Sequence, residues 1–159
     1  MIPLIKTALF TLVAPGTVAV LLPCLLAARG KQPPLEIGPL KYAGAVPILA
    51  GAALFLWCAY LFAVTGRGTP APIDPPKELV AQGPYRFVRN PMYLGIFAVL
   101  AGEAVLFESR ILSQYAGTVV LVFYLFVVVY EEPSLRRRFG PSYQRYLEAV
   151  PRFIPRPRA

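Results

Sequence analysis

Two short polar segments hold most of the residues that could do chemistry in this 159-residue chain. The first, residues 89–93, begins an apolar run, and the second, residues 130–132, ends another one. At the start of the first run, Asn90 is a favourable helix N-cap and Pro91 a favourable first helical residue. A helix start presents unpaired N–H groups and a partial positive charge, so it suits a carboxylate or a phosphate.

The second segment supplies the opposite charge, because Glu131 and Glu132 follow one another there. A ligand with both an anionic and a cationic group would suit the two segments together, and S-adenosylmethionine has a carboxylate, an ammonium and a sulfonium. Aromatic rings that could stack on its adenine or face its sulfonium are Tyr85, Phe87, Tyr93, Tyr130 and Phe139. The candidates for a catalytic role are Arg89, Glu131 and Glu132. Each feature also has a structural explanation, as a helix cap, an acidic first turn or an interfacial aromatic belt.

The composition excludes several other kinds of site. The chain has no histidine, which excludes a Ser-His-Asp triad, a Cys-His dyad and a histidine-ligated metal. Cys24 and Cys58 lie in apolar runs without metal-ligand spacing, so we expect both to be small buried residues. The net charge of +8 is compatible with nucleic acid or with an anionic membrane surface. No nucleic-acid motif accompanies the basic residues, so we expect a membrane partner and neither nucleic acid nor metal.

The elements that must position the two polar segments have the composition of membrane helices. Hydrophobic residues make up 57% of the chain and charged residues 15%, against about 25% charged in a soluble domain. We therefore predict one all-α membrane domain, a bundle of about four transmembrane helices that ends in a helical hairpin and a short helical tail. The predicted spans are residues 7–28, 41–65, 91–107 and 112–130, and the tail is 131–159. Gly44 and Gly51 predict a face that another helix approaches closely, with lipid-facing filler as the alternative.

Loop charges predict the orientation of the bundle. With four spans, both termini and the long polar stretch 66–90 share one side, and that side carries most of the 16 Lys and Arg residues. By the positive-inside rule this side is cytoplasmic. The same topology brings both polar segments to one cytoplasmic mouth, although they are far apart in the sequence.

The order of residues 83–95 resembles the signature of the isoprenylcysteine carboxyl methyltransferase family, which is related to the membrane phospholipid N-methyltransferases. That signature reads G-x-Y, four residues, and then H/N-P-x-Y. The later part matches as well: Glu131-Glu132, Phe139-Gly140, Tyr143, Tyr146 and Val150-Pro151. The resemblance covers about half the chain, residues 77–155. It implies a pocket for S-adenosylmethionine built from membrane-helix ends and the tail, with no Rossmann domain.

The resemblance also implies individual roles. Cofactor contacts carried over by position are Lys77, Glu78, Leu79, Val80, Tyr85, Asn90, Pro91, Met92, Tyr93 and Glu131. Asn90 stands where the eukaryotic prenylcysteine enzymes have histidine, and asparagine can still donate a hydrogen bond. Val127 stands where those enzymes have an arginine assigned to the substrate. Valine cannot clamp a carboxylate, so prenylcysteine is not carried over; Arg86 or Arg89 could take the place of that arginine.

These observations predict an S-adenosylmethionine-dependent methyltransferase at the cytoplasmic membrane face, acting on a lipophilic or membrane-embedded carboxylate or amine. The main alternative is a non-enzymatic membrane protein that keeps the fold and has a binding or assembly role. A transporter subunit is disfavoured, because the first two runs contain almost no polar residues. Glu103 lies inside the third run, where an acid is a functional candidate by default, although a structural or interfacial role is the alternative.

Overall fold

The computed structural model describes residues 2–29, 33–65 and 79–155, and every regular element in these ranges is a helix. The first long helix consists of α1 (Ile2–Gly16), a π-helical turn (Thr17–Leu21) and α2 (Leu22–Arg29). A 3-10 helix (Gly38–Gly44) leads into α3 (Ala45–Val64). After a short 3-10 turn (Gly83–Arg86) comes α4 (Pro91–Leu106).

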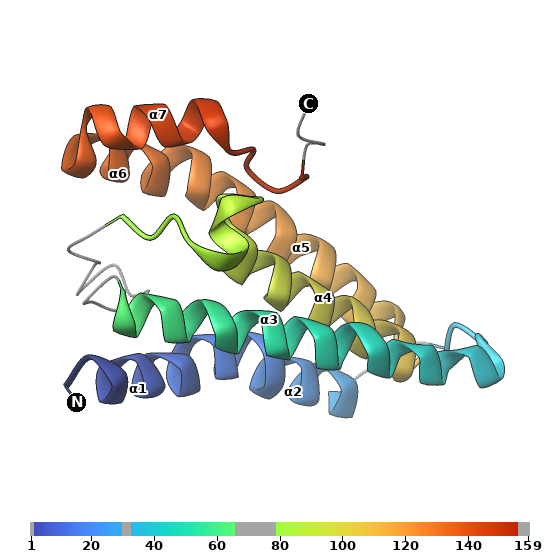
Figure 1. Cartoon of the computed structure of the whole chain (residues 1–159). Coiled ribbons are helices and arrows are strands. Elements are labelled where there is room, and N and C mark those ends of the chain that lie inside the picture. Colours follow the sequence, from blue (N-terminus) through green and yellow to red (C-terminus); the bar gives the residue numbers. More distant parts are fainter. Residues whose placement is uncertain (1, 30–32, 66–78, 156–159) are drawn as a thin grey trace.

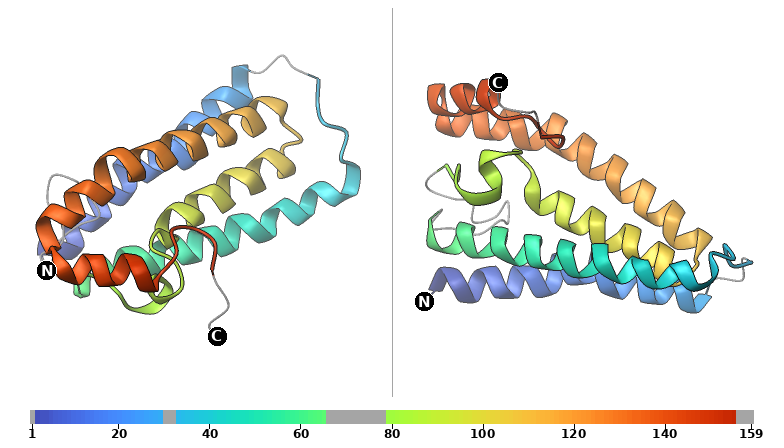
Figure 2. Two further views of the ribbon diagram at one scale, coloured as in Figure 1. Left: turned by 90° about the horizontal axis from the view of Figure 1, so that it is seen from above. Right: turned by 45° about the vertical axis from the view of Figure 1, so that its right-hand side comes forward.

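The second half of the chain contains the longest continuous helix. It consists of α5 (Arg110–Phe126), a π-helical turn (Val127–Glu131) and α6 (Glu132–Phe139), and Gly140 separates it from α7 (Pro141–Ala149). Four long helices close into a ring, because α1 packs on α3, α3 on α4, α4 on α5, and α5 on α2. Figures 1 and 2 show the start of α1 and the helices α6 and α7 at the same end of this ring. The predicted all-helical membrane fold is confirmed.

The helices differ in length, and this difference shapes the site. Three of them are long and apolar enough to cross a membrane, namely Leu9–Arg29, Gly38–Val64 and Arg110–Phe139. The fourth, α4, has 16 residues, so it spans about 24 Å at roughly 1.5 Å per residue, against a hydrocarbon core of roughly 30 Å. Because α4 starts well before the end of its neighbour α5–α6, residues 79–90 and α7 occupy the space above its first turn (Figure 1).

The long helix does not end where the sequence suggested. We expected the fourth run to stop at Tyr130, since Glu131-Glu132-Pro133 has the pattern of a new helix start. The helix instead continues to Phe139 through the π-helical turn Val127–Glu131. Pro133 has no N–H group to donate to the preceding helical turn, so one backbone hydrogen bond is lost there. The wider π-helical turn lies at this position. The helix ends at Gly140, which adopts a φ of 53°, and α7 begins at Pro141.

Glycines let α3 and α4 pack backbone against backbone, as the small residues of the second run predicted. Gly51 faces Gly95 and Gly44 faces Gly102. A Cβ atom built on Gly95 would lie 2.7 Å from the carbonyl oxygen of Gly51, which is closer than real contacts allow. This close approach fixes α4, and with it the residues of its first turn, relative to α3.

The two cysteines differ in their surroundings. Cys58 is fully buried between α3 and its neighbours, as expected, whereas Cys24 is exposed on α2, so the expectation of a buried residue is wrong there. Apolar composition does not distinguish a helix face that packs on protein from one that faces lipid. Other apolar residues of α2 are exposed in the same way, including Leu22 and Leu25.

A carboxylate fixes the connection between α4 and α5 at the end of the bundle opposite α7. Glu108 accepts hydrogen bonds from the backbone N–H of Gly38 at 2.9 Å and from Lys41 Nζ at 2.9 Å. The hydrogen bond from Lys41, aided by that from Gly38, holds the pKa of Glu108 below its ordinary value. The start of the second long helix is thereby attached to the hairpin turn.

A pH series should report this attachment. Because the folded-state pKa of Glu108 is lowered, its contribution to stability is present above the ordinary glutamate pKa of about 4.3 and is lost as the pH falls through the folded-state value. We expect Glu108→Gln to lower the thermal unfolding midpoint in detergent at neutral pH, and the difference from wild type to shrink as the pH falls below the ordinary glutamate pKa of about 4.3. Glu148→Gln on exposed α7 is the control. A difference that is constant over the whole pH range would contradict the assignment.

The glycine contact between α3 and α4 predicts a steric effect on stability. Gly95→Ala should destabilise the protein by about 1–3 kcal/mol, because the backbone of α3 cannot move away without repacking. Gly117→Ala in α5 is the matched control, since a Cβ there meets nothing within 4 Å. Thermal unfolding in detergent measures both variants. Equal midpoints for the two would show that the helices do not approach as described.

Candidate functional site

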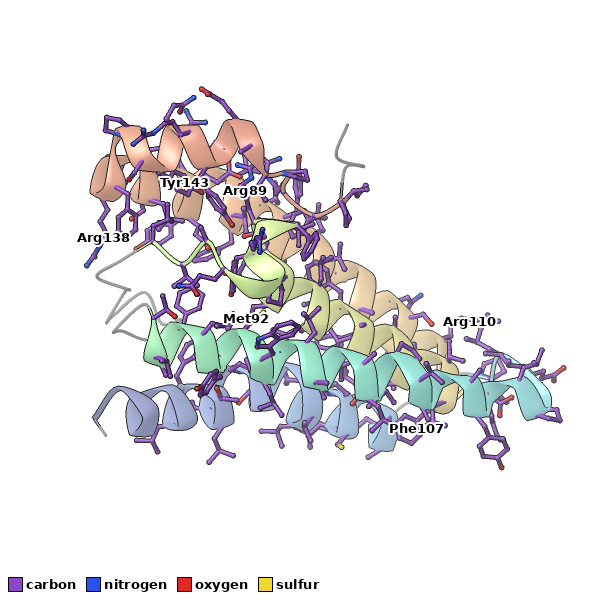
Figure 3. The ribbon with its side chains drawn as sticks, in the orientation of Figure 1. Arg89, Met92, Phe107, Arg110, Arg138 and Tyr143 are labelled. Atoms are coloured by element: carbon purple, nitrogen blue, oxygen red, sulfur yellow. The ribbon has the colours of Figure 1, made fainter. Side chains whose placement is uncertain are left out.

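A cavity of about 450 Å³ opens at the end of the bundle where α4 begins and α5 runs into α6. Its walls come from α1, α3, residues 79–90, α4, the α5–α6 helix and α7. The volume lies within the range of roughly 300–1,000 Å³ that is usual for small-molecule sites. In Figure 3, Arg89, Met92, Arg138 and Tyr143 lie at this end of the molecule, while Phe107 and Arg110 lie at the other.

Most of the residues singled out in the sequence meet in this cavity. Those that line it are Leu79, Val80, Tyr85, Arg89, Asn90, Met92, Tyr93 and Glu131. Pro91 is buried and does not line the cavity. Lys77 and Glu78 lie outside the described residues. The cofactor contacts themselves stay a prediction at this point.

Aromatic side chains occupy several positions on the cavity wall. Four of the five rings that the sequence pointed to line it, namely Tyr85, Tyr93, Tyr130 and Phe139. Phe87 does not line it and is 58% exposed. Rings contributed by separate helices could therefore face one ligand, which suits a planar base or a cation.

One face of α6 and of the turn before it points into the cavity. Glu131, Ser134, Leu135 and Arg138 all line it, and their spacing of three, four and seven residues places them on one side of a helix. The Tyr93 hydroxyl donates a hydrogen bond to Glu131 Oε2 at 2.6 Å, which orients the carboxylate. The negative Glu131 and the positive Arg138 thus lie on the same face, about 10 Å apart along the helix axis.

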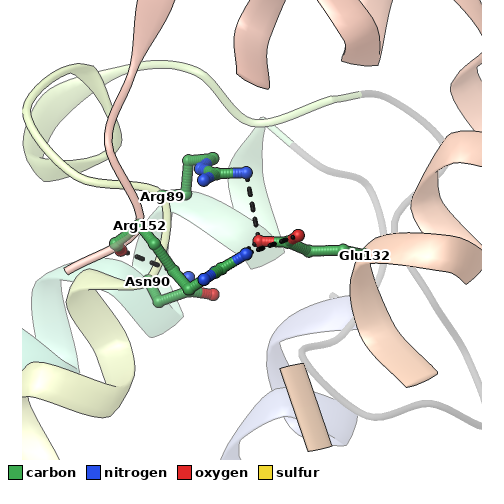
Figure 4. A network of polar contacts seen from close by, with 4 residues as sticks. All are labelled: Arg89, Asn90, Glu132 and Arg152. Atoms are coloured by element: carbon green, nitrogen blue, oxygen red, sulfur yellow. Dashed lines mark hydrogen bonds and ion pairs between the residues drawn. The ribbon is translucent and has the colours of Figure 1, made fainter. Parts of the chain in front are cut away.

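The adjacent carboxylate, Glu132, faces a different environment. It is 6% exposed, does not line the cavity, and accepts from Arg152 Nε at 2.8 Å and Arg152 Nη2 at 3.0 Å. Arg89 Nη1 lies 3.0 Å from Glu132 Oε1 (Figure 4). Successive residues in a helix point about 100° apart, so the two neighbouring glutamates serve different sites. Glu132 joins the start of α4 to the end of the chain.

The segment after α7 is bound to the backbone that leads into α4. The Arg89 N–H donates to the Pro151 carbonyl at 2.8 Å, and the Asn90 N–H donates to the Arg152 carbonyl at 3.2 Å. The Asn90 side chain Nδ2 donates to the same carbonyl at 3.2 Å. Asn90 occupies the N-cap position of α4, but its side chain makes no capping hydrogen bond. The prediction that the Asn90 side chain caps α4 is therefore wrong, because the side-chain amide donates to the Arg152 carbonyl instead.

Tyrosines of α7 cover the 3-10 turn on the other side of the cavity. The Tyr146 hydroxyl donates to the Tyr85 carbonyl at 2.7 Å in a buried hydrogen bond. Burial raises the pKa of Tyr143 to about 12 and raises those of Tyr85 and Tyr146 as well. These phenols keep their protons at neutral pH, so they act as hydrogen-bond donors and not as bases.

The sequence did not predict that several other residues belong to the site. Arg152 lies 20 positions after Glu132, and no local pattern relates the two. Phe10, Ala14 and Val18 of the first long helix line the cavity, although their run had indicated only hydrophobicity. Arg138 had a usable signal, its spacing of seven from Glu131.

Other residues that the sequence analysis considered for a function do not line the cavity. Val127 is fully buried, and neither it nor Arg86 lines the cavity. Glu103 lies near the other end of α4 and also does not line it. Among the described residues, Glu103 Oε2 is buried and has no hydrogen-bond partner.

Residues 40–142 match the family model described as phospholipid methyltransferase. The chain is 32% identical over 101 residues to the nickel-cobalt-cadmium resistance protein NccN of Alcaligenes xylosoxydans xylosoxydans, a match covering 64% of this chain and 43% of that protein. It is 34% identical over 77 residues to the protein-S-isoprenylcysteine O-methyltransferase of Schizosaccharomyces pombe, covering 48% of this chain and 33% of that protein.

A further relative is protein-S-isoprenylcysteine O-methyltransferase B of Arabidopsis thaliana, with 32% identity over 78 residues, or 49% of this chain and 40% of that protein. The matches thus cover less than half the length of each of these curated relatives. No solved structure matches the chain significantly.

The buried hydrogen bond between Tyr146 and Tyr85 can be tested by removing one oxygen atom. Tyr146→Phe leaves the Tyr85 carbonyl without its donor, and we expect a loss of stability of about 1–2 kcal/mol. Tyr60→Phe, on a residue that is 58% exposed on α3, is the control. Chemical or thermal unfolding in detergent compares them. If both variants unfold as wild type does, α7 is not held to the 3-10 turn in this way.

Proposed function

The chain belongs to the phospholipid methyltransferase family, and on this premise we propose that it transfers a methyl group from S-adenosylmethionine to a lipophilic acceptor at the cytoplasmic membrane face. The observation that carries the proposal is the cavity in which the first turn of α4 meets Glu131 at the end of membrane-length helices. The proposal includes both termini on the cytoplasmic side, which rests on the loop charges.

The charged and aromatic side chains that line the cavity are of types suited to the charged groups and the adenine of S-adenosylmethionine. Glu131, oriented by Tyr93, would hold a cationic group, and Arg138 would hold the carboxylate. The rings of Tyr85 and Tyr130 would face the adenine or the sulfonium. When bound, S-adenosylmethionine supplies an activated methyl group that needs a nucleophile in line with it.

The remaining lining residues would orient the reactants and keep water away. Phe55, Phe62, Val80, Met92 and Ile96 make the inner wall apolar. Excluding water and fixing the approach of a nucleophile are the main tasks in a displacement on an already activated carbon. If the acceptor is a carboxylate, methyl transfer requires no general acid or base from this wall.

An amine acceptor would have to lose a proton. The phenols of Tyr85 and Tyr143 are poor bases, because a raised pKa keeps them protonated. Glu132 does not line the cavity and is paired with Arg89 and Arg152. Glu131 is then the group in the cavity that could accept the proton. Both acceptor types stay within the proposal.

The proposed acceptor is lipophilic because helices that face the lipid also line the cavity. Phe10, Ala14 and Val18 contribute from the first long helix, and Val122 and Phe126 contribute from α5. A hydrocarbon chain could therefore contact the same cavity as a water-soluble cofactor. The relatives named isoprenylcysteine O-methyltransferases support a lipid-modified acceptor in general terms, without identifying the one used here.

One relative is named as a nickel-cobalt-cadmium resistance protein. In the part of the chain that the structure describes, no three His, Cys, Asp or Glu side chains are placed to hold a metal ion. The alternative that we keep is a membrane protein with this fold and a binding or assembly role without catalysis.

Binding of the demethylated product tests the proposal without knowledge of the acceptor. We expect S-adenosylhomocysteine to bind the detergent-purified chain in calorimetry, and Glu131→Gln to weaken binding about tenfold through loss of a charged hydrogen-bond acceptor. Glu148→Gln, on an exposed residue of α7, should bind as wild type does. Absence of binding to folded wild-type protein up to millimolar ligand would favour the non-enzymatic alternative.

A further inference from the structure

The three residues that follow Val150 contact both the segment that leads into α4 and the helix α5. We call Pro151–Phe153 the C-terminal strap. Its carbonyls at Pro151 and Arg152 accept from the backbone of Arg89 and Asn90. Its Phe153 ring lies 6.0 Å from Phe97 of α4 and 6.3 Å from Tyr124 of α5, measured between ring centroids. The strap therefore bridges the start of α4 and the α5–α6 helix at the edge of the cavity.

The strap engages one end of the Asn90 amide and leaves the other end for a ligand. Nδ2 donates to the Arg152 carbonyl at 3.2 Å, and only the NH₂ end of an amide can make that bond. Asn90 also lines the cavity, and in Figure 4 its oxygen points away from the carbonyl of Arg152. With Nδ2 engaged by the strap, the oxygen is the end of the amide left to accept from a ligand, where the sequence had suggested a donor. An amide oxygen of this kind suits an N–H donor of the ligand, such as an ammonium group.

A two-pronged ion pair holds the strap in place. Arg152 donates from Nε and Nη2 to the two oxygens of Glu132, at 2.8 and 3.0 Å. The Arg152 side chain is 29% exposed and that of Glu132 is 8% exposed, and partly buried bidentate pairs are stronger than exposed ones. The guanidinium also lies 5.6 Å from the centre of the Tyr124 ring. These contacts fix the main chain of residue 152, and thus its carbonyl.

We propose that Arg152 is a positioning residue, which latches the C-terminal strap to Glu132 so that the Asn90 amide oxygen faces the cavity and accepts from the ammonium group of the bound cofactor. This inference rests on the proposed function for the identity of the ligand. It assigns to Arg152 an effect on binding although its side chain does not line the cavity.

The chain offers variants that separate this role from general stability. Arg152→Gln removes the charge and the two-pronged bond, while Arg89 still lies 3.0 Å from Glu132, so no buried carboxylate is left unpaired. Arg152→Lys keeps the charge without the fork geometry. Arg145→Gln is the matched control, because among the described residues Arg145 is an exposed arginine of α7 without an ion pair.

Calorimetry with two ligands provides the first readout. S-adenosylhomocysteine contains the amino-acid ammonium, and 5′-methylthioadenosine lacks it but keeps the nucleoside. We expect Arg152→Gln to weaken binding of S-adenosylhomocysteine about tenfold, the usual size for a hydrogen bond to a charged group. Arg152→Lys should show a smaller loss, and Arg145→Gln none. Binding of 5′-methylthioadenosine should be unchanged in all three variants.

A double variant tests whether the effect passes through Asn90. Asn90→Ala should weaken S-adenosylhomocysteine to a similar degree, and adding Arg152→Gln should cause no further loss, because coupled residues are not additive. Additive losses, or equal weakening of both ligands by Arg152→Gln, would overturn the proposal and indicate general disorder of the site. Wild-type affinity in Arg152→Gln would overturn it as well.

Hydrogen exchange supplies a readout that needs no ligand. The N–H groups of Arg89 and Asn90 donate to the strap, so Arg152→Gln should speed their exchange while Arg145→Gln should not. If wild-type protein binds neither ligand but these amides respond as expected, the proposed function fails and the latch stands. If the amides do not respond, the latch itself is refuted, whatever the ligand results.

Discussion

The buried carboxylate of Glu132 connects three parts of the chain that meet only at one end of the bundle. It lies on the helix that continues α5, and it pairs with Arg89 at the start of α4 and with Arg152 near the end of the chain. A carboxylate that is 6% exposed is costly unless it is paired and hydrogen-bonded. The three segments must therefore come together for the charge to be satisfied, and the cavity lies beside their junction. The neighbouring Glu131 is directed into that cavity as a consequence of helix geometry, and Tyr93 holds it there.

Helix length and helix packing determine where the junction forms. The glycine contacts of Gly51 with Gly95 and of Gly44 with Gly102 hold α4 tightly against α3. Because α4 is short, it does not reach as far toward this end of the bundle as the helix that continues from α5. The polar residues of its first turn are thus surrounded by helices and covered by α7. In the proposed function this arrangement lets a water-soluble cofactor and a lipid-borne acceptor reach the same cavity from different sides.

Much of the fold and part of the site could be predicted from the sequence, for physical reasons that differ between residues. Long apolar runs and the Asn90-Pro91 helix start are local signals, and they led to the helices and to the convergence of residues 89–93 with Glu131. The continuation of the helix past Tyr130 was missed, because a π turn that tolerates Pro133 has no sequence signature as clear as that of a helix start. Arg152 was missed because its partner lies 20 residues away, and only the turn at Gly140 brings the two together. The exposed Cys24 shows the same limit, since apolar composition alone does not tell a lipid-facing position from a buried one.

The most direct test of the central claim is transfer of the methyl group itself. Detergent-purified protein, reconstituted in bilayers of total lipid extract, would be incubated with S-adenosylmethionine carrying a radiolabelled methyl group, and the label would be followed into the organic phase. The account predicts label in a lipid-extractable product with wild-type protein and less label with Glu131→Gln at a cofactor concentration below saturation. Label that stays in the aqueous phase, from folded protein that binds S-adenosylhomocysteine, would contradict a lipophilic acceptor. Absence of both transfer and binding would contradict the assignment of the cavity to this cofactor.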